Sequence, residues 1–358
     1  MAYQGRILAR SPYFITASGT TLENAILYIY IWAGSSAAKP TTYNYKISKT
    51  PVQAGDDEII FEISQFIRDE FEHNRDAYDD TLTDFADCLW VETSLVIVDS
   101  GGLQPSVDDS YLAVDGYGYY SDGINPSWNF DEYTVRVKKF NVGGFIFANS
   151  DFPVPAHETD GIDRIETYIN GVMSGTTVLI DTNNSQDKLR YLSYGSIEPN
   201  YLTKVILKNG ATEVQTINFE YIEDCIETAK EVRYYDRNGA LSTTYMFGRG
   251  ITSLKSKRDD YRQDVGFMST AYSYDSSKHQ KRTFDVSANE SLVLNSGFVP
   301  EDQNEIFKQI ILSELVWVDD KPVNVKDSSF TYKTNKQDKL INYTLNLDYA
   351  YNEINNVY

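Results

Sequence analysis

The segment that ends the chain alternates strictly between apolar and polar side chains, and no other feature limits the possible folds as narrowly. Within Leu340–Tyr351, the positions from Ile341 to Tyr349 alternate between one set that carries Ile, Tyr and Leu and a second set that carries Asn, Thr and Asp. Successive side chains of a β-strand point to opposite faces, so this segment predicts a strand with one buried and one wet face.

A second alternating segment, Thr21–Trp32 (TLENAILYIYIW), is apolar or aromatic on both faces. It predicts a central strand that is covered on both sides. Further short runs separated by turn residues follow along the chain, and such a series is typical of β-sandwiches. These runs are Tyr43–Lys49, Glu58–Ile63, Leu89–Val98, Tyr111–Val114, Thr134–Phe140, Gly144–Ala148, Arg164–Ile180, Leu202–Lys208, Thr212–Tyr221, Glu231–Tyr235, Ala240–Phe247, Leu315–Val318 and Pro322–Val325.

Asn-Gly pairs mark the tightest predicted hairpins. Asn170-Gly171 lies inside one run, and Asn209-Gly210 and Asn238-Gly239 each separate two runs. Asn-Gly is the preferred pair of type I′ turns because both residues tolerate a positive φ.

Two segments carry a helical pattern. Phe66, Ile67 and Phe71 form a short apolar stripe that follows Ser64, the predicted N-cap. The stronger helix is predicted at Glu301–Glu314, where acidic residues favour the N-terminus electrostatically. Its buried stripe is predicted to consist of Ile306, Phe307, Ile310 and Ile311.

The length of 358 residues exceeds what one compact core usually holds. We therefore expect a mainly β protein of two or three β-sandwich-like modules with a few short helices. The predicted units are residues 1–132, an N-terminal β-sandwich, residues 133–225, a central β-rich unit, and residues 226–358, a C-terminal β-rich domain with one helix at 301–314. The central unit is either a separate domain or an insertion into one sandwich.

Charge and aromatic content point towards assembly. The chain has 52 acidic and 32 basic residues, a net charge of −20. Such a surface repels phosphate backbones, so we expect no specific nucleic-acid binding and, at most, a surface past which DNA slides. The 28 Tyr, 17 Phe and 4 Trp suit strands and protein interfaces.

The two cysteines, Cys88 and Cys225, have no metal-type spacing, and we expect them to be reduced. No apolar signal region opens the sequence, and no stretch is apolar enough to span a membrane. These features predict a protein that is made and folded in a cytoplasm, without a membrane partner.

Motifs for chemistry are missing. His73, His157 and His279 stand alone in polar contexts, and the sequence has no Walker loop, GxSxG elbow or HExxH pattern. Asp181–Asp187 resembles the start of a calcium loop, but Gln186 replaces the turn glycine and Leu192 replaces the bidentate glutamate. Acidic clusters at Asp76–Asp87 and at Glu158, Asp160 and Asp163 arise by chance in so acidic a chain. We expect no catalytic residue, metal or cofactor.

Two sets of residues are candidates for interfaces. Lys255, Lys257, Arg258 and Arg262 form the one basic concentration, in an exposed loop or arm. They are predicted either to be solvated next to Asp259, Asp260 and Asp264 or to dock on an acidic neighbouring subunit. The run Gly116–Tyr120 (GYGYY) supplies the second set, Tyr117, Tyr119 and Tyr120, which favours interface packing over a glycan-stacking platform.

Three segments resemble structural tail or neck proteins of crAss-like and other Bacteroidetes-infecting tailed phages. They are Ser11–Gly34 (SPYFITASGTTLENAILYIYIWAG), Val232–Phe247 (VRYYDRNGALSTTYMF) and a closing block. The block runs from Ser296-Gly297 through the Glu301 helix, Val316–Val318 and Pro322-Val323 to Lys339–Thr344. With their surroundings these segments cover roughly a third to a half of the chain, and no catalytic residues are among them.

The resemblance implies a virion component, assembled in the cytoplasm of a host bacterium. It would be one subunit of a tail or neck ring through which DNA passes, in contact with copies of itself and with portal, tail or fibre proteins. The alternative is a tail-fibre or adhesin subunit that binds host surface glycans, and an enzyme such as a virion glycosidase is the third possibility. Since fold does not fix function, a β-sandwich alone does not choose among them.

Overall fold

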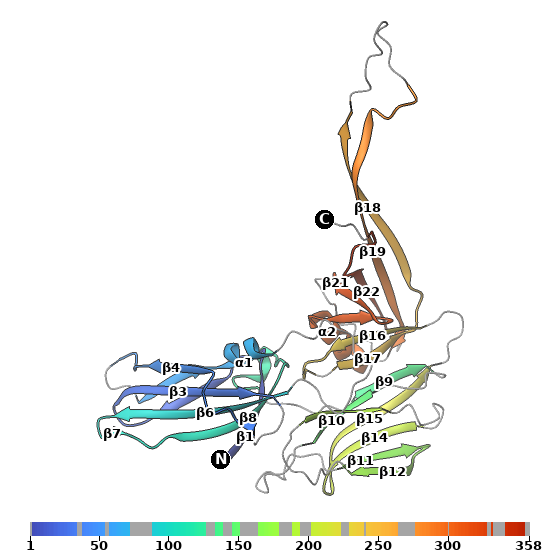
Figure 1. Cartoon of the computed structure of the whole chain (residues 1–358). Helices are drawn as coiled ribbons and strands as arrows, with labels where there is room; N and C mark the ends of the chain where they lie inside the picture. The colour runs from blue at the N-terminus through green and yellow to red at the C-terminus, as the bar shows by residue number, and fades with distance from the viewer. Residues whose placement is uncertain are drawn as a thin grey trace.

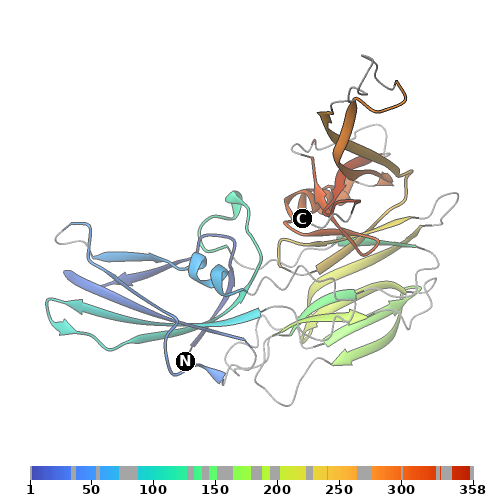
Figure 2. The same cartoon turned by 45° about the horizontal axis from the view of Figure 1, so that its top comes forward.

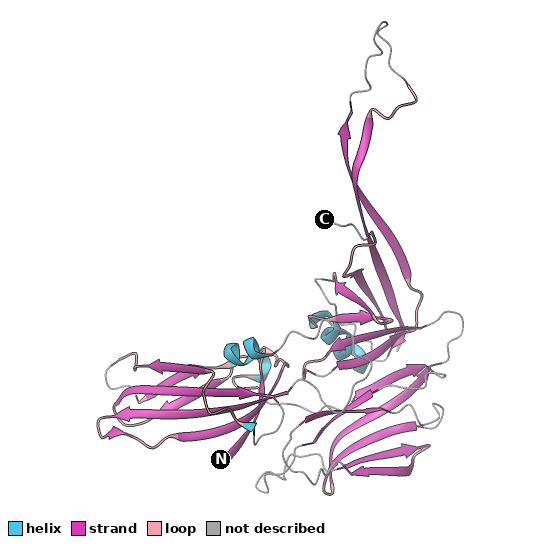
Figure 3. Ribbon diagram, in the orientation of Figure 1, coloured by secondary structure: helices cyan, strands magenta, loops and turns pink. Residues whose placement is uncertain are grey.

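The structure is a computed structural model, and it describes residues 2–33, 38–53, 57–71, 88–126, 133–138, 145–150, 164–178, 188–193, 202–222, 229–239, 241–263, 276–299, 301–327, 331 and 341–354. Strands make up most of the described residues and form several separate sheets, whereas helices are few and short (Figure 3). The predicted fold class, mainly β, is therefore confirmed.

The N-terminal module consists of a large sheet and a small sheet. The large sheet has the order β1-β8-β6-β3-β4, with β7 beside β6. The small sheet pairs β2 with β5. The bounds are β1 Ala2–Leu8, β2 Phe14–Ser18, β3 Leu22–Trp32, β4 Tyr45–Lys49, β5 Glu58–Glu62, β6 Cys88–Asp99, β7 Gly102–Leu103 and β8 Val107–Val114.

The alternation in β3 explains the core of this module. Ala25, Leu27 and Ile29 lie on one face of β3 and are buried against Phe61 of β5 and Ile67 of α1 (Ser64–Glu70). The prediction that β3 is central is confirmed, since it lies between β6 and β4. The prediction that both faces are covered is wrong for the second face, whose side chains are only half-buried. They are Ile26, Tyr28, Tyr30 and Trp32.

The central unit has one five-stranded sheet, of order β12-β11-β14-β15-β9, and the pair β10-β13. Val205, Leu207 and Ile217 are fully or almost fully buried in it. The strand β9 runs parallel to β15 and also contacts β17 of the next sheet. The bounds are β9 Tyr133–Lys138, β10 Phe145–Ser150, β11 Arg164–Ile169, β12 Val172–Val178, β13 Lys188–Ser193, β14 Leu202–Asn209 and β15 Thr212–Ile222.

The C-terminal sheet has seven strands, in the order β17-β16-β20-β21-β22-β19-β18 (Figure 1). The helix α2 (Asn304–Leu312) packs Phe307 and Ile310 against it, and the rings of Phe307 and Tyr343 lie 4.7 Å apart. The bounds are β16 Lys230–Tyr235, β17 Leu241–Met246, β18 Ile251–Arg262, β19 Lys281–Val299, β20 Val316–Val318, β21 Lys321–Val325 and β22 Ile341–Tyr349. The predicted boundaries at 132/133 and 225/226 fall between the three groups of strands.

The hairpin turn predicted at Asn170-Gly171 is confirmed, whereas the type I′ turns predicted at Asn209-Gly210 and Asn238-Gly239 are not formed by those pairs. Asn170 and Gly171 both have positive φ (49° and 78°). Between β14 and β15 the two loop residues are Gly210 and Ala211, because Asn209 already pairs with Thr212.

The Asn238-Gly239 turn lies within a longer loop, because Tyr235 and Leu241 are the last pair of β16 and β17. Asp319 and Asp320, between β20 and β21, form a type I′ pair with φ of 47° and 67°.

The helix ends also differ from prediction. Ser64 is the first residue of α1 and makes no cap bond, since its backbone N–H and its hydroxyl both donate to the Glu62 carboxylate. The second helix is shorter than predicted: residues Glu301–Gln303 form a 3₁₀ turn and Asn304–Leu312 the α-helix.

A buried carboxylate stabilises the central sheet. Glu166 is 7% exposed and accepts from Lys208 Nζ at 2.9 Å, Tyr168 Oη at 2.9 Å and Arg164 Nε at 3.2 Å. The Lys208 hydrogen bond is the largest of the causes that hold the pKa of Glu166 below its ordinary value of 4.5. A carboxyl with a depressed folded pKa stabilises the fold above its unfolded pKa, and this stabilisation is lost as pH falls through the folded pKa.

A Glu166→Gln variant is therefore expected to be less stable than the wild type at neutral pH, with a difference that shrinks below about pH 4.5. Unfolding in urea across the pH range measures this difference. Glu213→Gln is the matched control, because the Glu213 carboxylate is 57% exposed and lies 3.8 Å from the same Lys208. A difference between wild type and Glu166→Gln that stays constant with pH would contradict this role.

Candidate functional site

Two strands of the C-terminal sheet extend far beyond the other five (Figure 1). β18 pairs with β19 from Ile251↔Val293 to Arg262↔Lys281, whereas β22 pairs with β19 only from Ser291 onward. We call β18 together with Lys281–Glu290 of β19 the arm. Near the base of the arm, the Glu353 backbone N–H donates to Ala288 O. From Ser287 outward, β18 is the one described strand that pairs with β19.

The arm is exposed along β18 and at its outer end. Every residue of β18 except Asp259 is exposed, and the four residues Lys281–Phe284 of β19 are exposed as well. An isolated two-stranded ribbon is at best marginally stable in water, because it has no third layer against which to bury side chains. β18 also forms the edge of its sheet among the described residues, and an open edge is a template for pairing with another chain.

The arm carries the basic residues that the sequence analysis singled out. Lys255, Lys257, Arg258 and Arg262 all lie in β18. The sequence predicted an exposed loop or arm for this segment, and the structure shows an exposed strand that forms part of the arm. The ammonium group of Lys257 lies 3.7 Å from the Asp259 carboxylate, so the neighbouring acidic residues neutralise part of this charge.

Apolar side chains accompany these charges. Leu254 is 60% exposed and Phe284 is 67% exposed. The Phe284 ring lies tilted beside the Tyr261 ring, with centroids 6.1 Å apart, next to a bulge at Asp259/Asp260. The arm therefore combines cations, exposed apolar groups and an open strand edge, which are the components of a protein-binding surface.

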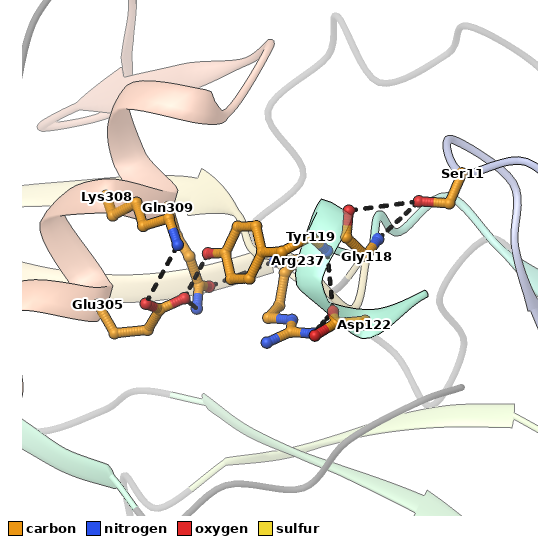
Figure 4. A network of polar contacts seen from close by, with 8 residues as sticks. All are labelled: Ser11, Gly118, Tyr119, Asp122, Arg237, Glu305, Lys308 and Gln309. Atoms are coloured by element: carbon orange, nitrogen blue, oxygen red, sulfur yellow. Dashed lines mark hydrogen bonds and ion pairs between the residues drawn. The ribbon is translucent and has the colours of Figure 1, made fainter. Parts of the chain in front are cut away.

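The second candidate site is the joint between the N-terminal module and the C-terminal sheet (Figure 4). The Tyr119 hydroxyl donates to the Glu305 carboxylate of α2. The Tyr119 ring contacts two cations: the Arg237 guanidinium carbon lies 4.6 Å and Lys308 Nζ 3.2 Å from its centroid. Arg237 also pairs with Asp122 at 2.7 Å. These contacts tie the segment after β8 to both the β16–β17 loop and α2.

Two backbones cross closely at the joint. The Tyr117 N–H donates to Arg237 O at 2.7 Å. A Cβ placed on Gly116 would lie 2.5 Å from Arg237 O, and one on Gly239 would lie 3.0 Å from Gly116 N. Side chains at these two positions would force the two segments apart.

Ser11 holds the same segment from the side of the N-terminal module. The Gly118 N–H donates to Ser11 Oγ at 2.7 Å (Figure 4). Arg10 and Arg68, also from the N-terminal module, both pair with Glu314, at 2.8 Å and 3.0 Å. The joint is therefore a polar interface with contacts from several elements on each side.

Burial changes the acidity of the two tyrosines at the joint. Desolvation is the main cause that raises the pKa of Tyr117, to about 12. It is also the main cause that raises the pKa of Tyr119. The hydrogen bond to Glu305 acts in the same direction on Tyr119. Both hydroxyls therefore stay protonated at neutral pH.

The three predicted interface tyrosines differ in burial. Tyr117 and Tyr119 are partly buried within the joint, inside one chain, whereas Tyr120 is fully exposed. Sequence reasoning did not identify their partners Arg237 and Glu305, because these are distant in sequence. The one local signal was the alternation of glycine and tyrosine in GYGYY, which places backbone without Cβ atoms beside aromatic rings.

The residues considered for chemistry are mostly outside the described part of the chain. His73, His157, Asp181–Asp187, Asp76–Asp87, Glu158, Asp160 and Asp163 lie outside the described residues, and His279 is exposed. Within the described ranges, no three His, Cys, Asp or Glu side chains are close enough to hold a metal ion. No helix in that part of the chain is both long and apolar enough to cross a membrane.

No protein-family model matches the sequence, and no curated protein matches it either. One solved structure with some likeness comes from work on host cell surface retention of a 1.5-MDa bacterial ice-binding adhesin. The identity is 12% and the TM-score 0.17, over 68% of this chain and 79% of that one. A TM-score this low does not relate the two folds.

Proposed function

We propose that this protein is a non-enzymatic structural subunit of a tailed-phage virion, which assembles with copies of itself into a tail or neck ring through which DNA passes. The arm carries this proposal. Outward from Glu290 the arm is a ribbon of two strands whose outer strand is almost wholly exposed, so it has little stabilising contact of its own. Contact with a neighbouring subunit would bury its apolar groups and cover its edge.

The joint supports the same role. A subunit that closes a ring must hold its modules at a fixed angle, because small angular errors add up around the ring. The close approach of Gly116 and Gly239, with Tyr119 held by Glu305 and Arg237, supplies a fixed connection of this kind.

The charge of −20 fits a wall along which DNA moves without sticking, because phosphates are repelled by an acidic surface. The resemblance of Ser11–Gly34, Val232–Phe247 and the closing block to phage tail and neck proteins points to the same place in a virion.

Shortening the arm is expected to abolish self-assembly without unfolding the chain. Ser256 and Ala288 are directly opposite, so Lys257–Ser287 can be replaced by Asn-Gly, which closes a two-residue hairpin and keeps the Glu353–Ala288 hydrogen bond. Native mass measurement over a range of concentrations should show a closed oligomer for the wild type and a monomer for the shortened chain.

Circular dichroism and urea unfolding check that the shortened chain is folded. An oligomer of unchanged size in the shortened chain would contradict the role of the arm. The position in the virion has its own test: purified particles should contain the protein at a copy number set by the symmetry of a ring.

The glycan-binding alternative makes a different prediction, a monomer or trimer with measurable glycan affinity. The run Gly116–Tyr120 gives this alternative little support. The Tyr119 ring already contacts Arg237 and Lys308, and Tyr120 is the one ring of the run that is fully exposed to a ligand. A Tyr120→Ala variant with reduced binding to a glycan array would favour that alternative.

A further inference from the structure

Charge is distributed unevenly along the chain. Residues 1–132 contain 21 acidic and 7 basic residues, whereas residues 226–358 contain 19 and 17. The acidity of the protein is therefore mainly a property of its N-terminal part. A chain whose acidity is concentrated in one part can attract a locally basic surface of a second copy to that part.

The end of the N-terminal module that lies farthest from the joint carries exposed carboxylates. Glu23 lies at the start of β3, and Asp57 and Glu58 lie at the start of β5. Asp57 binds this end together, since its carbonyl accepts from the Gly19 N–H at 3.0 Å and its carboxylate from the Thr21 N–H at 3.3 Å. We call Glu23, Asp57 and Glu58 the acidic end.

The outer part of the arm carries the opposite sign. Residues 255–263 and 276–286 contain seven basic and three acidic side chains. In β18 the basic residues occupy both faces of the ribbon, because Lys255 and Lys257 share one face and Arg258 lies on the other. The seven are Lys255, Lys257, Arg258, Arg262, Lys278, Lys281 and Arg282.

The acidic end and the arm point away from the joint in different directions (Figures 1 and 2). The N-terminal module extends to one side, and the arm rises from the C-terminal sheet. A contact between them within one chain would require the joint to open. A contact between two copies requires no such change.

We propose that the arm of one copy docks on the acidic end of the N-terminal module of a second copy. This inference rests on the proposed function and names the partner surface of the arm. The contact joins two different surfaces, so it is head-to-tail, and repetition produces a closed ring or an open filament according to the angle between successive copies. Since the charged groups lie at exposed positions, salt weakens the contact.

Two charge-reversed chains test the direction of this contact. The arm-reversed chain carries Lys255→Glu, Lys257→Glu and Arg258→Glu, and the end-reversed chain carries Glu23→Lys and Glu58→Lys, which leaves Asp57 in place. Each chain alone should remain monomeric at concentrations at least tenfold above those at which the wild type assembles. A chain with all five substitutions should assemble again, because its two surfaces are complementary with exchanged signs.

The equimolar mixture gives the sharpest result. The wild-type arm of the end-reversed chain is complementary to the wild-type acidic end of the arm-reversed chain, and the two reversed surfaces are complementary to each other, so head-to-tail contacts form only between unlike chains. Native mass measurement should show oligomers in which the two chains alternate, at concentrations at which neither chain assembles alone. A Lys46→Glu/Lys321→Glu chain, changed at exposed lysines away from both surfaces, controls for negative charge added outside the arm and should assemble like the wild type.

Three results would overturn the inference. An end-reversed chain that assembles like the wild type shows that the arm binds elsewhere and leaves the proposed function intact. A mixture that stays monomeric at concentrations at which the wild type assembles contradicts the head-to-tail contact between the arm and the acidic end. A wild type that stays monomeric at every concentration overturns both this inference and the self-assembly in the proposed function.

Discussion

A Gly116→Ala substitution is expected to open the joint between the N-terminal module and the C-terminal sheet. The added Cβ would lie 2.5 Å from Arg237 O and 3.0 Å from the Asn238 carbonyl carbon, and both are backbone atoms that cannot rotate away. Overpacking of this kind costs roughly 1–3 kcal/mol. The Tyr117–Arg237 backbone hydrogen bond, 2.7 Å in the wild type, would be lost with it.

The expected result is a change of shape with the modules still folded, because the shortest contact of the added Cβ is with backbone of the other module. Small-angle scattering should show a larger radius of gyration, and limited proteolysis should cut faster near residue 116. Gly250→Ala is the matched control, since its added Cβ meets nothing closer than 3.5 Å. An unchanged scattering curve for Gly116→Ala would show that the joint does not depend on this close approach.

The largest expected loss of stability comes from Phe61→Ala. Phe61 is 0% exposed and lies between the two sheets of the N-terminal module, in one cluster with Leu27 and Ile29 of β3. Removing a buried Phe side chain costs about 3–5 kcal/mol, because the lost burial is joined by the cavity that remains. The neighbouring Ile60→Ala is the matched control, as Ile60 is 51% exposed on the opposite face of the same strand.

A single unfolding transition cannot be assumed for a chain of several sheets. Hydrogen exchange of the β3 amides measures the loss locally, and Phe61→Ala should raise their exchange rates by roughly two orders of magnitude or more. The amides of β22, in the C-terminal sheet, should keep their rates. Equal changes for Phe61→Ala and Ile60→Ala would contradict the assignment of Phe61 to the core.

The arm shows why one part of the fold was harder to predict. β3 and β22 could be recognised from sequence because burial on one face imposes an alternating pattern. The segment Lys255–Arg262 has no such pattern, since both faces of the arm are exposed. Its strand conformation results from pairing with β19, and a propensity-based reading of KSKRDDYR could not include that partner.

The joint shows a second limit of the sequence. The basic and tyrosine-rich segments were recognised as unusual from composition alone, but the Tyr119–Glu305 hydrogen bond links residues 186 positions apart. Asn238-Gly239 was recognised as a turn. No local pattern predicts that this loop contacts Gly116 of another module, because the contact depends on how whole sheets pack.

The sequence by itself determined the β class, most strands and the two unusual surface segments, because alternation, turn residues and charge are local properties of the chain. The tertiary structure alone decided that Tyr117 and Tyr119 lie within a joint, and that the basic segment is a strand at the edge of a projecting arm. Both depend on contacts between distant segments, and such contacts form only when separate sheets fold and pack together.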